Sequence, residues 1–348
     1  MDKAFSLIVI VILVGTMLYF VPIIGQILGV TGGNVGNELS GVIAISFDHG
    51  KTFHEGSMQS SYGSVDINDF DYLQAHSLKK PLLLAASSKG LLLSDNDGIS
   101  WNFFDDLHHE LSGVDVRDIA INPYNKREVL IAAHKDGNGV LYRSDNTFFT
   151  VEKIFEDEER INAIHAYGDG LYIGTQDGKL IRYNLSNNTF RVLGTFGSPI
   201  VSLFGGMYVE NLYIITKDRG VFVSSDQGNS LIGLRNKIGE RFDAMIKTIA
   251  FDEGAHVSYA ATALGIIESV DGYNWRNINE GASPLLSINA LAVSSGGVFF
   301  AGVHDKMYVS RDHGFNWEYS DPFSRKEDEL SVIKLLRNDT LVLVGTRN

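Results

Sequence analysis

The sequence of 348 residues contains no cysteine. This absence excludes disulfide bonds, thiolate zinc sites and a cysteine nucleophile, and it also excludes a lipoprotein anchor on a cysteine. Positive charge is also scarce, because 29 lysine and arginine residues face 42 aspartate and glutamate residues, for a net charge of −13. A chain this acidic is a poor partner for nucleic acid and for the surface of an anionic membrane.

One short motif, Ser-x-Asp-x-Gly-x-Thr/Asn-aromatic, returns along the chain. The clear copies are residues 46–53, 94–101, 224–231, 268–275 and 310–317, and two degenerate copies end at Phe148 and Phe190. Successive copies are separated by roughly 41 to 48 residues, which is the period of one blade of a β-propeller. The sequence therefore predicts seven copies of one structural unit.

Each copy follows two apolar runs of about five residues that a short turn separates. Residues 82–86 and 91–93 are one such pair. Runs rich in Val, Ile, Leu, Tyr and Phe and bounded by Gly and Asp are typical of strands in hairpins. Another apolar run precedes each pair, as at residues 118–121, and a more polar run follows each motif. The pattern predicts an all-β fold, a seven-bladed β-propeller with four antiparallel strands in each blade.

The two ends of the repeat region are incomplete and complementary. Residues 330–336 and 340–345 have the pattern of the first two strands of a blade, whereas residues 41–45 have the pattern of a third strand that leads into the first motif. We expect these strands to pair in one sheet and close the ring, because closure leaves only short, protected sheet edges.

The motif residues suit a tight turn between the third and fourth strands. An Asp or Asn oxygen accepts hydrogen bonds from nearby backbone N–H groups, and Gly adopts the positive φ of such a turn. The terminal aromatic residue is expected to pack between blades, with Trp101, Trp275 and Trp317 largely buried. The residues assigned a structural role in these turns are Asp48, Gly50, Asn96, Gly98, Asp226, Gly228, Asp271, Gly272, Asp312 and Gly314.

The residues in front of the repeats are apolar, and residues 4–30 contain no charged side chain. A helix of about 26 residues is about 39 Å long, enough to span a hydrocarbon core of about 30 Å. We therefore interpret residues 1–30 as one N-terminal transmembrane helix, residues 31–40 as a flexible stalk and residues 41–348 as the propeller. The alternative is a cleaved signal peptide, whose apolar region normally has about 7–15 residues.

Lys3 and the α-amino group precede the apolar stretch. Positive charge on this side favours a single-pass membrane protein with a cytoplasmic N-terminus and an extracytoplasmic propeller. Because cysteine-free domains outside the cytoplasm are more usual in bacteria than in animals, we expect a prokaryotic source.

The repeated motif resembles the Asp box, also called the BNR repeat, and the resemblance covers essentially all of residues 41–348. Asp-box propellers include sialidases, xyloglucan-type glycoside hydrolases, sortilin-like receptor domains and propellers similar to photosystem II assembly factors. The chain looks most like the last group, which has an N-terminus close to the membrane and no obvious catalytic signature. The resemblance implies a non-catalytic binding or assembly scaffold for protein or polysaccharide.

The alternative within the same resemblance is a glycoside hydrolase, sialidase-like or xyloglucanase-like. A sialidase site needs an arginine cluster for the substrate carboxylate, a Tyr–Glu nucleophile pair and an acidic Asp. Sialidases usually carry Arg-Ile-Pro ahead of the first Asp box, and residues 41–45 of this chain lack it. No Glu–Tyr pair is evident in the sequence, so we expect no sialidase or glycosidase turnover.

Propeller ligands usually bind the face formed by the loops that enter the innermost strands and the loops between second and third strands. The candidate residues on this face are Arg117, Arg160, Arg219, Arg241, Asp105, Asp106, Glu110, His108 and the acidic run 156–159. A glycosidase that uses two carboxylates would draw on the acidic residues among them. His108 and His109 lie beside Asp105 and Asp106 in a spacing that matches no standard metal site, so we expect neither a metal nor a cofactor.

Overall fold

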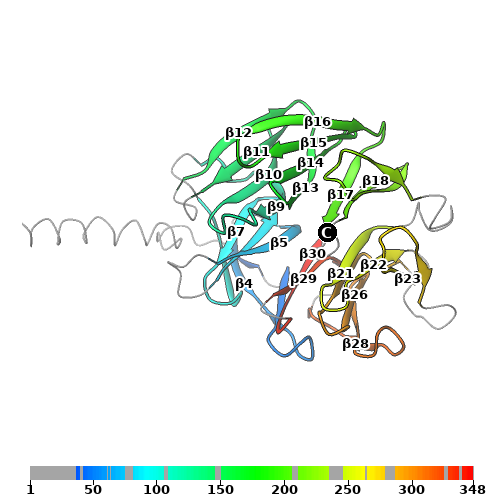
Figure 1. The fold of residues 1–348 in the computed structure, drawn as a ribbon. Coiled ribbons are helices and arrows are strands. Elements are labelled where there is room, and N and C mark those ends of the chain that lie inside the picture. The colour runs from blue at the N-terminus through cyan, green and yellow to red at the C-terminus, as the bar shows by residue number, and fades with distance from the viewer. Residues whose placement is uncertain are drawn as a thin grey trace, which may run out of the picture.

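The computed structural model describes residues 37–39, 42–60, 62, 64–74, 81–105, 109–145, 150–205, 211–234, 246–262, 265–278, 287–324, 328–336 and 339–347. Their strands form seven sheets around a central axis (Figure 1). The all-β, seven-bladed propeller predicted from the repeats is therefore confirmed. Within this part of the chain, no helix has both the length and the hydrophobicity to span a membrane. The predicted transmembrane helix at residues 1–30 lies outside the described residues.

Each sheet is a blade whose strands run from the axis to the rim, and we number the blades from the one that holds both chain ends. Blade 1 contains β29 (Glu329–Leu336), β30 (Leu341–Arg347), β2 (Ile43–Ser46) and β3 (His54–Glu55). Blade 2 contains β5 (Ile67–Leu73), β6 (Leu82–Ser87), β7 (Gly90–Ser94) and β8 (Ser100–Phe103). Blade 3 contains β9 (Asp115–Ile121), β10 (Val129–Lys135), β11 (Asn138–Ser144) and β12 (Glu152–Asp157).

The remaining blades repeat this order. Blade 4 contains β13 (Ile161–Tyr167), β14 (Gly170–Thr175), β15 (Lys179–Asn184) and β16 (Thr189–Thr195), and blade 5 contains β17 (Ile200–Gly205), β18 (Leu212–Thr216), β19 (Gly220–Ser224) and β20 (Ile232–Gly233). Blade 6 contains β21 (Thr248–Asp252), β22 (Val257–Thr262), β23 (Gly265–Ser269) and β24 (Arg276–Asn277), and blade 7 contains β25 (Ala290–Val293), β26 (Phe299–Val303), β27 (Lys306–Ser310) and β28 (Glu318–Ser320).

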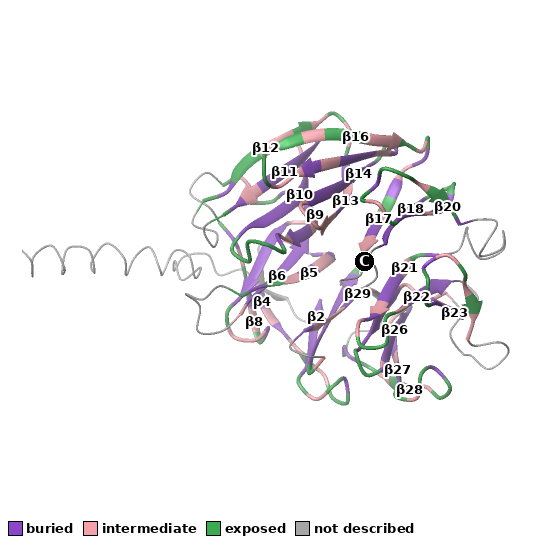
Figure 2. Cartoon of the chain, in the orientation of Figure 1, coloured by how far each residue is buried: buried purple, intermediate pink, exposed green. Residues whose placement is uncertain are grey.

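The core lies between the blades, because each sheet packs both of its faces against a neighbour. Every residue of β6, β14 and β18 is buried, so these strands are continuous apolar runs rather than alternating ones. The outermost strand β16 has no buried residue. Figure 2 shows this gradient, with buried second and third strands and exposed residues on outer strands and turns.

The ring closes within blade 1, as the sequence predicts. β2 pairs antiparallel with β30, with Ile43 opposite Gly345 and Ser46 opposite Val342. Ala44, Val342 and Val344 are all fully buried in the cluster that blade 1 shares with blade 7. Residues almost 300 positions apart in the sequence therefore complete one hydrophobic layer.

Blade 2 is wider than the predicted four strands. The chain leaving blade 1 adds β4 (Ser57–Ser60) to the outer strand β8 in parallel, and β1 (Asn37–Leu39) pairs antiparallel with β4. Gly56 allows this approach, since a Cβ there would lie 2.8 Å from the carbonyl oxygen of Gly98 and 3.0 Å from Trp101 Nε1. Three residues of the expected stalk are therefore paired in a sheet.

Five of the innermost strands carry a β-bulge at their second or third residue, where one residue is left out of the ladder. The bulged residues are Asn68, Arg117, Asn162, Val201 and Ser331. A bulge re-aims its side chain, and here three of the five reach the next blade. Ser331 Oγ donates to the carbonyl of Ile67 at 2.8 Å, Asn68 Nδ2 to that of Val116 at 2.7 Å, and Asn162 Nδ2 to that of Ile200 at 3.0 Å.

Candidate functional site

The propeller has two unlike faces. The motif face holds the turns between third and fourth strands and the connections between first and second strands. The loop face holds the connections from one blade to the next and the turns between second and third strands. Because the innermost strands start at the loop face, the bulged residues surround the mouth of the central channel on that face.

The repeated motif forms the same hydrogen-bonded turn in five blades. In blade 1 the hydroxyl of Ser46 donates to Asp48 Oδ1 at 2.7 Å and accepts from the N–H of Gly50 at 2.8 Å. Asp48 Oδ1 also accepts from the N–H of Thr52 at 2.9 Å. Corresponding bonds form at Asn96, Asp226, Asp271 and Asp312.

The glycines of these turns adopt the backbone conformation for which they were assigned. Gly50, Gly98, Gly228, Gly272 and Gly314 have φ values from 74° to 88°. At Gly50 a Cβ would also lie 2.5 Å from the ring of Phe300 in the neighbouring blade. The turn therefore needs glycine both for its φ and for its contact with the next blade.

Hydrogen bonds from the turn keep these carboxylates charged. The backbone N–H of Asn274 is the main cause that lowers the pKa of Asp271 to about 2. The backbone N–H of Asn316 is the main cause that lowers the pKa of Asp312, and the side chain of Ser230 is the main cause that lowers that of Asp226. Each of these carboxylates accepts hydrogen bonds from donors in its own turn, so the turns have a structural explanation.

The three motif tryptophans differ in burial, which corrects the expectation that all are largely buried. Trp101 is 1% exposed, whereas Trp275 and Trp317 are only partly buried. The indole N–H groups of Trp275 and Trp317 donate to the carbonyls of Gly272 and Gly314 in their own turns, at 3.3 and 3.0 Å. Trp101 is enclosed further because β4 covers the outer edge of blade 2.

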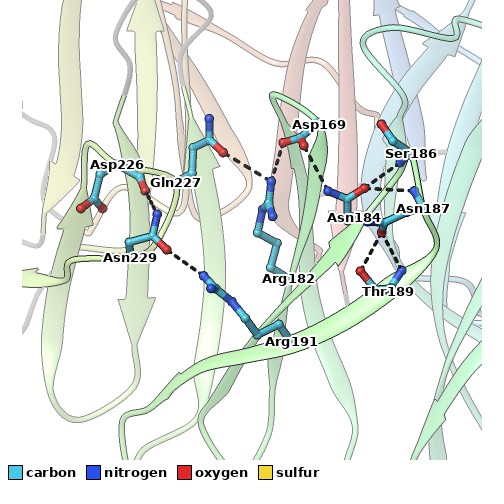
Figure 3. A network of polar contacts seen from close by, with 10 residues as sticks. All are labelled: Asp169, Arg182, Asn184, Ser186, Asn187, Thr189, Arg191, Asp226, Gln227 and Asn229. Atoms are coloured by element: carbon cyan, nitrogen blue, oxygen red, sulfur yellow. Dashed lines mark hydrogen bonds and ion pairs between the residues drawn. The ribbon is translucent and has the colours of Figure 1, made fainter.

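On the motif face, polar side chains join blades 4 and 5 (Figure 3). Arg182 of β15 forms an ion pair with Asp169 and donates to Gln227 Oε1 at 3.3 Å. Arg191 of β16 donates to Asn229 Oδ1 at 2.7 Å. Gln227 and Asn229 belong to the motif turn of blade 5, so both arginines hold that turn in place.

A central cavity of about 1190 Å³ runs between the innermost strands. Four basic residues line its loop-face mouth, namely Arg117, Lys217, Lys247 and Arg347. Arg347 donates to Asn68 Oδ1 at 2.9 Å, and Lys247 Nζ donates to Asn289 Oδ1 at 2.6 Å. The mouth is therefore a basic rim on a chain whose net charge is −13.

Deeper in the cavity lies a cluster of charged groups from different blades. It consists of Asp69 and Asp71 of β5, Asp118 of β9, His165 of β13 and Lys334 of β29, and we call it the channel cluster. Asp69 and Asp118 hydrogen-bond to each other through their side chains. Asp118 Oδ2 accepts from the N–H of Ile164 at 2.8 Å, so this carboxylate also provides a hydrogen-bond acceptor for the innermost strand of the next blade.

Burial and mutual repulsion set the protonation of the channel cluster. Burial raises the pKa values of Asp69, Asp71 and Asp118, and the charge of Asp69 raises that of Asp118 further. Burial opposes the charge of Lys334, but the three carboxyl groups outweigh it and raise the pKa of Lys334. Lys334 is therefore charged, and its charge opposes the effect of burial on the pKa values of Asp69 and Asp71.

His165 gives the cluster a measurable pH response. Burial, followed by the charge of Lys334, lowers the pKa of His165 from 6.5 to about 4. The unfolded chain therefore binds this proton while the folded chain does not, and the free energy of unfolding falls as pH falls from about 6.5 to 4. At about 1.4 kcal/mol per pKa unit, this pKa difference corresponds to about 3 kcal/mol of the free energy of unfolding.

We expect His165→Asn to remove this pH dependence. Urea unfolding at pH 7 and pH 4.5 should show that the variant loses less stability on acidification than the parent chain, because no imidazole needs to be protonated. His165→Gln serves as a second neutral variant and should behave in the same way. Equal losses for parent and variants would contradict the buried, neutral histidine.

Of the predicted ligand-face residues that the structure describes, one lies in the cavity wall. Arg117 lines the mouth and lies 3.6 Å from Asp115. Arg160 and Arg219 lie on the loop face, exposed and away from the cavity lining. Asp105 is exposed, and its Oδ1 lies 2.5 Å from His109 Nδ1. Asp106, His108 and Arg241 lie outside the described residues.

One Glu–Tyr pair, which was not expected from the sequence, is present. Tyr142 OH donates to Glu110 Oε2 at 3.1 Å, and Lys135 Nζ lies 2.7 Å from the same oxygen. Tyr142 is only 1% exposed and belongs to the core between blades 2 and 3. A nucleophile must reach its substrate, so this pair fits a buried hydroxyl that is satisfied by a surface carboxylate.

Two members of the acidic run 156–159 also form ion pairs or hydrogen bonds. Glu156 accepts from Lys153 and Asn138, each at 2.7 Å, and Asp157 Oδ2 lies 3.5 Å from Lys179. No group of His, Cys, Asp and Glu suited to a metal ion occurs among the residues whose placement is described.

Sequence reasoning missed the channel cluster. Its signal was present, because an apolar residue followed by a polar one recurs at or near the start of the innermost strands, as in Ile67-Asn68 and Val116-Arg117. Asp69 and Asp118 follow at the same position of two neighbouring blades. A charged residue inside an otherwise apolar innermost strand marks a channel-lining position.

Neither a protein-family model nor a curated protein sequence matches this chain. Among solved structures, it is similar to YCF48 from Cyanidioschyzon merolae, with 14% identity and a TM-score of 0.58 over 80% of this chain and 95% of that one. It is also similar to YCF48 bound to a D1 peptide, with 11% identity and a TM-score of 0.62 over 91% of this chain and 99% of that one.

A GH74 enzyme from Niastella koreensis is similar too, with 13% identity and a TM-score of 0.62 over 81% of this chain. This chain spans about half the length of that enzyme, 51%. At such identities the likeness shows the propeller fold alone. The similar structures include a propeller that is bound to a peptide and a glycoside hydrolase. These are the two kinds of function that the motif resemblance leaves open.

Proposed function

We propose that the chain is a membrane-anchored, extracytoplasmic propeller that acts as a non-catalytic scaffold and binds a partner on its loop face. The observation that carries this proposal is the basic rim formed by Arg117, Lys217, Lys247 and Arg347 on an otherwise acidic chain. Positive side chains around a rigid mouth favour a partner that presents acidic or polar groups. Val201, 40% exposed, adds an apolar contact at the same mouth.

A protein partner fits this rim better than a polysaccharide does. Peptide segments supply the carboxylates that pair with lysine and arginine, whereas neutral polysaccharides do not. The similar propeller that is bound to a D1 peptide supports a role in protein binding. The anchor is residues 4–30, whose lack of charge is the evidence for it.

Hydrolysis of a glycoside is the second candidate, and the observation that favours it is the set of three carboxyl groups in the cavity. Retaining and inverting glycosidases hold their carboxyl groups about 5–5.5 Å and about 6.5–9.5 Å apart. Asp69 and Asp118 are hydrogen-bonded to each other, which is closer than either arrangement. This pair therefore does not fit glycosidase geometry, and we propose the scaffold as the first candidate.

Charge reversal on the loop face tests the proposal. We expect Lys217→Glu with Lys247→Glu in the full chain to reduce capture of the partner from solubilised native membranes about tenfold or more, because rim charges steer and hold an oppositely charged surface. Lys126→Glu with Arg127→Glu is the matched control, since this pair lies on the motif face between β9 and β10 and changes the net charge equally.

The opposite result, loss of capture with the control pair alone, would assign binding to the motif face. A panel of aryl glycosides and polysaccharides, assayed for reducing ends, tests the second candidate. Turnover that Asp118→Asn abolishes without unfolding the chain would replace the scaffold with an enzyme.

A further inference from the structure

The first strand of the described chain enters blade 2 from the loop-face side. β8 starts in the motif turn at Ser100 and runs toward the loop face. β4 runs parallel to β8, with Ser57 opposite Ser100, and β1 runs antiparallel to β4, with Asn37 opposite Ser60. The chain that precedes Asn37 therefore meets the propeller at the loop-face end of the outer edge of blade 2.

The linker between this point and the proposed anchor is short. The uncharged stretch ends at Val30, and residues 31–36 have the sequence Thr-Gly-Gly-Asn-Val-Gly. A glycine-rich linker of this length has a root-mean-square span of about 12–15 Å. A blade edge is taller, since a strand such as β9, with 7 residues, rises about 23 Å. A bilayer on the motif-face side would require a linker that is almost fully extended, which costs conformational entropy. The linker therefore favours a bilayer on the loop-face side.

The basic rim lies on this same face. Lys217 is exposed, and Lys247 donates to the neutral amide of Asn289. Arg117, in contrast, lies 3.6 Å from the carboxylate of Asp115. The two lysines belong to blades 5 and 6, which lie across the ring from blade 2. An acidic group that pairs with these lysines therefore lies between the loop face and the bilayer.

We propose that the short linker turns the loop face toward the membrane, and that the partner is an acidic extracytoplasmic segment of a protein embedded in the same membrane. This inference rests on the proposed anchor and on the proposed binding at the rim. A protein in the same membrane is held close to the rim, which raises its effective concentration. Anionic lipid headgroups fit less well, because they would also meet the rest of a chain whose net charge is −13.

Energy transfer to the lipid measures the orientation. Because the chain has no cysteine, single cysteines in the full chain can carry a donor fluorophore in phosphatidylcholine nanodiscs with a lipid-borne acceptor. Arg219→Cys and Ser225→Cys lie at the loop-face and motif-face ends of β19, and Lys89→Cys and Asp95→Cys lie at the corresponding ends of β7. The ends of a five-residue strand are about 17 Å apart. We expect a greater loss of donor emission at positions 219 and 89 than at positions 225 and 95.

Leu13→Cys reports on the anchor separately. Loss of emission at position 13, with an equal or greater loss at the motif-face ends, would overturn the orientation and leave the anchor intact. A difference of the expected sign in blade 2 alone would also overturn it, because the ring would then stand on its edge. No loss at position 13 would disprove the anchor, and the inference would fall with it. Binding at the rim would still be tested by the Lys217 and Lys247 variants.

A label-transfer cross-linker on the same cysteines tests the partner in intact native membranes. Position 219 should pass its biotin tag to a protein that stays in the membrane after alkaline washing, and position 225 should not. Lys217→Glu with Lys247→Glu in the same chain should abolish this transfer. A tagged protein that the wash releases, a tag found on lipid alone, or transfer from position 225 alone would each overturn a partner embedded in the same membrane and bound at the loop face.

Discussion

Deletion of residues 329–348 is expected to abolish the cooperative fold. The deletion removes β29 and β30, which are the two inner strands of blade 1, and leaves β2 with no neighbour on its axial side. Leu330, Val342 and Val344 leave the core with them, and all three are fully buried. An open ring exposes sheet edges and apolar blade faces, which pair with other chains. Size-exclusion chromatography and thermal unfolding should show aggregation and no single transition.

Deletion of residues 37–39 is the matched control for this effect. β1 also pairs at the edge of a blade, but on the rim rather than at the axis, and no other blade depends on it. The control should remain monomeric with only a small change in Tm. Addition of a peptide of residues 328–348 during refolding should restore the truncated chain, because the strands, not the covalent link, complete the sheet. A truncated chain that stays monomeric with an unchanged Tm would contradict closure.

Trp101→Ala is expected to cost about 3–5 kcal/mol of the free energy of unfolding, the range for removal of a large buried aromatic side chain. Trp101 packs against Phe70 at a ring-centroid distance of 6.0 Å and lies under Met58, which is itself 2% exposed. The blades on either side are held by their other strands, so the space that the indole leaves cannot collapse. Urea unfolding of the full chain measures the loss.

Trp317→Ala is the matched comparison and should cost less, since Trp317 occupies the same motif position but is only partly buried. Trp101→Phe should also cost less than Trp101→Ala, because the buried indole N–H of Trp101 has no hydrogen-bond partner to lose. Equal costs at positions 101 and 317 would mean that the motif position, and not burial, determines the contribution.

The strand pattern and the motif were readable from the sequence because both depend on local chemistry. A motif turn closes hydrogen bonds within a few residues, as between Ser46, Asp48 and Thr52, so its signature survives without knowledge of the rest of the chain. The same holds for the buried second and third strands, whose continuous apolar runs each belong to one segment. Closure was also predictable, since the two half blades have complementary strand patterns.

The features that the sequence left open join segments that are far apart. β4 is a weak strand in isolation, with the sequence Ser-Met-Gln-Ser, and it forms because the edge of β8 and the side chain of Trp101 are next to it. The different burial of Trp101 and Trp317 follows from this added strand. The wider blade 2 is therefore a product of contacts between blades.

The sequence by itself determined the number of blades, the four-strand unit, the turn chemistry and the pairing of the two ends, because each is encoded in local periodicity. Only the tertiary structure placed Asp69, Asp118, His165 and Lys334 in one cavity and left Arg160 and Arg219 outside it. The physical reason is that a ring brings one residue of each repeat to the axis and another to the same face, so sites are assembled from single residues that have no neighbours in the sequence.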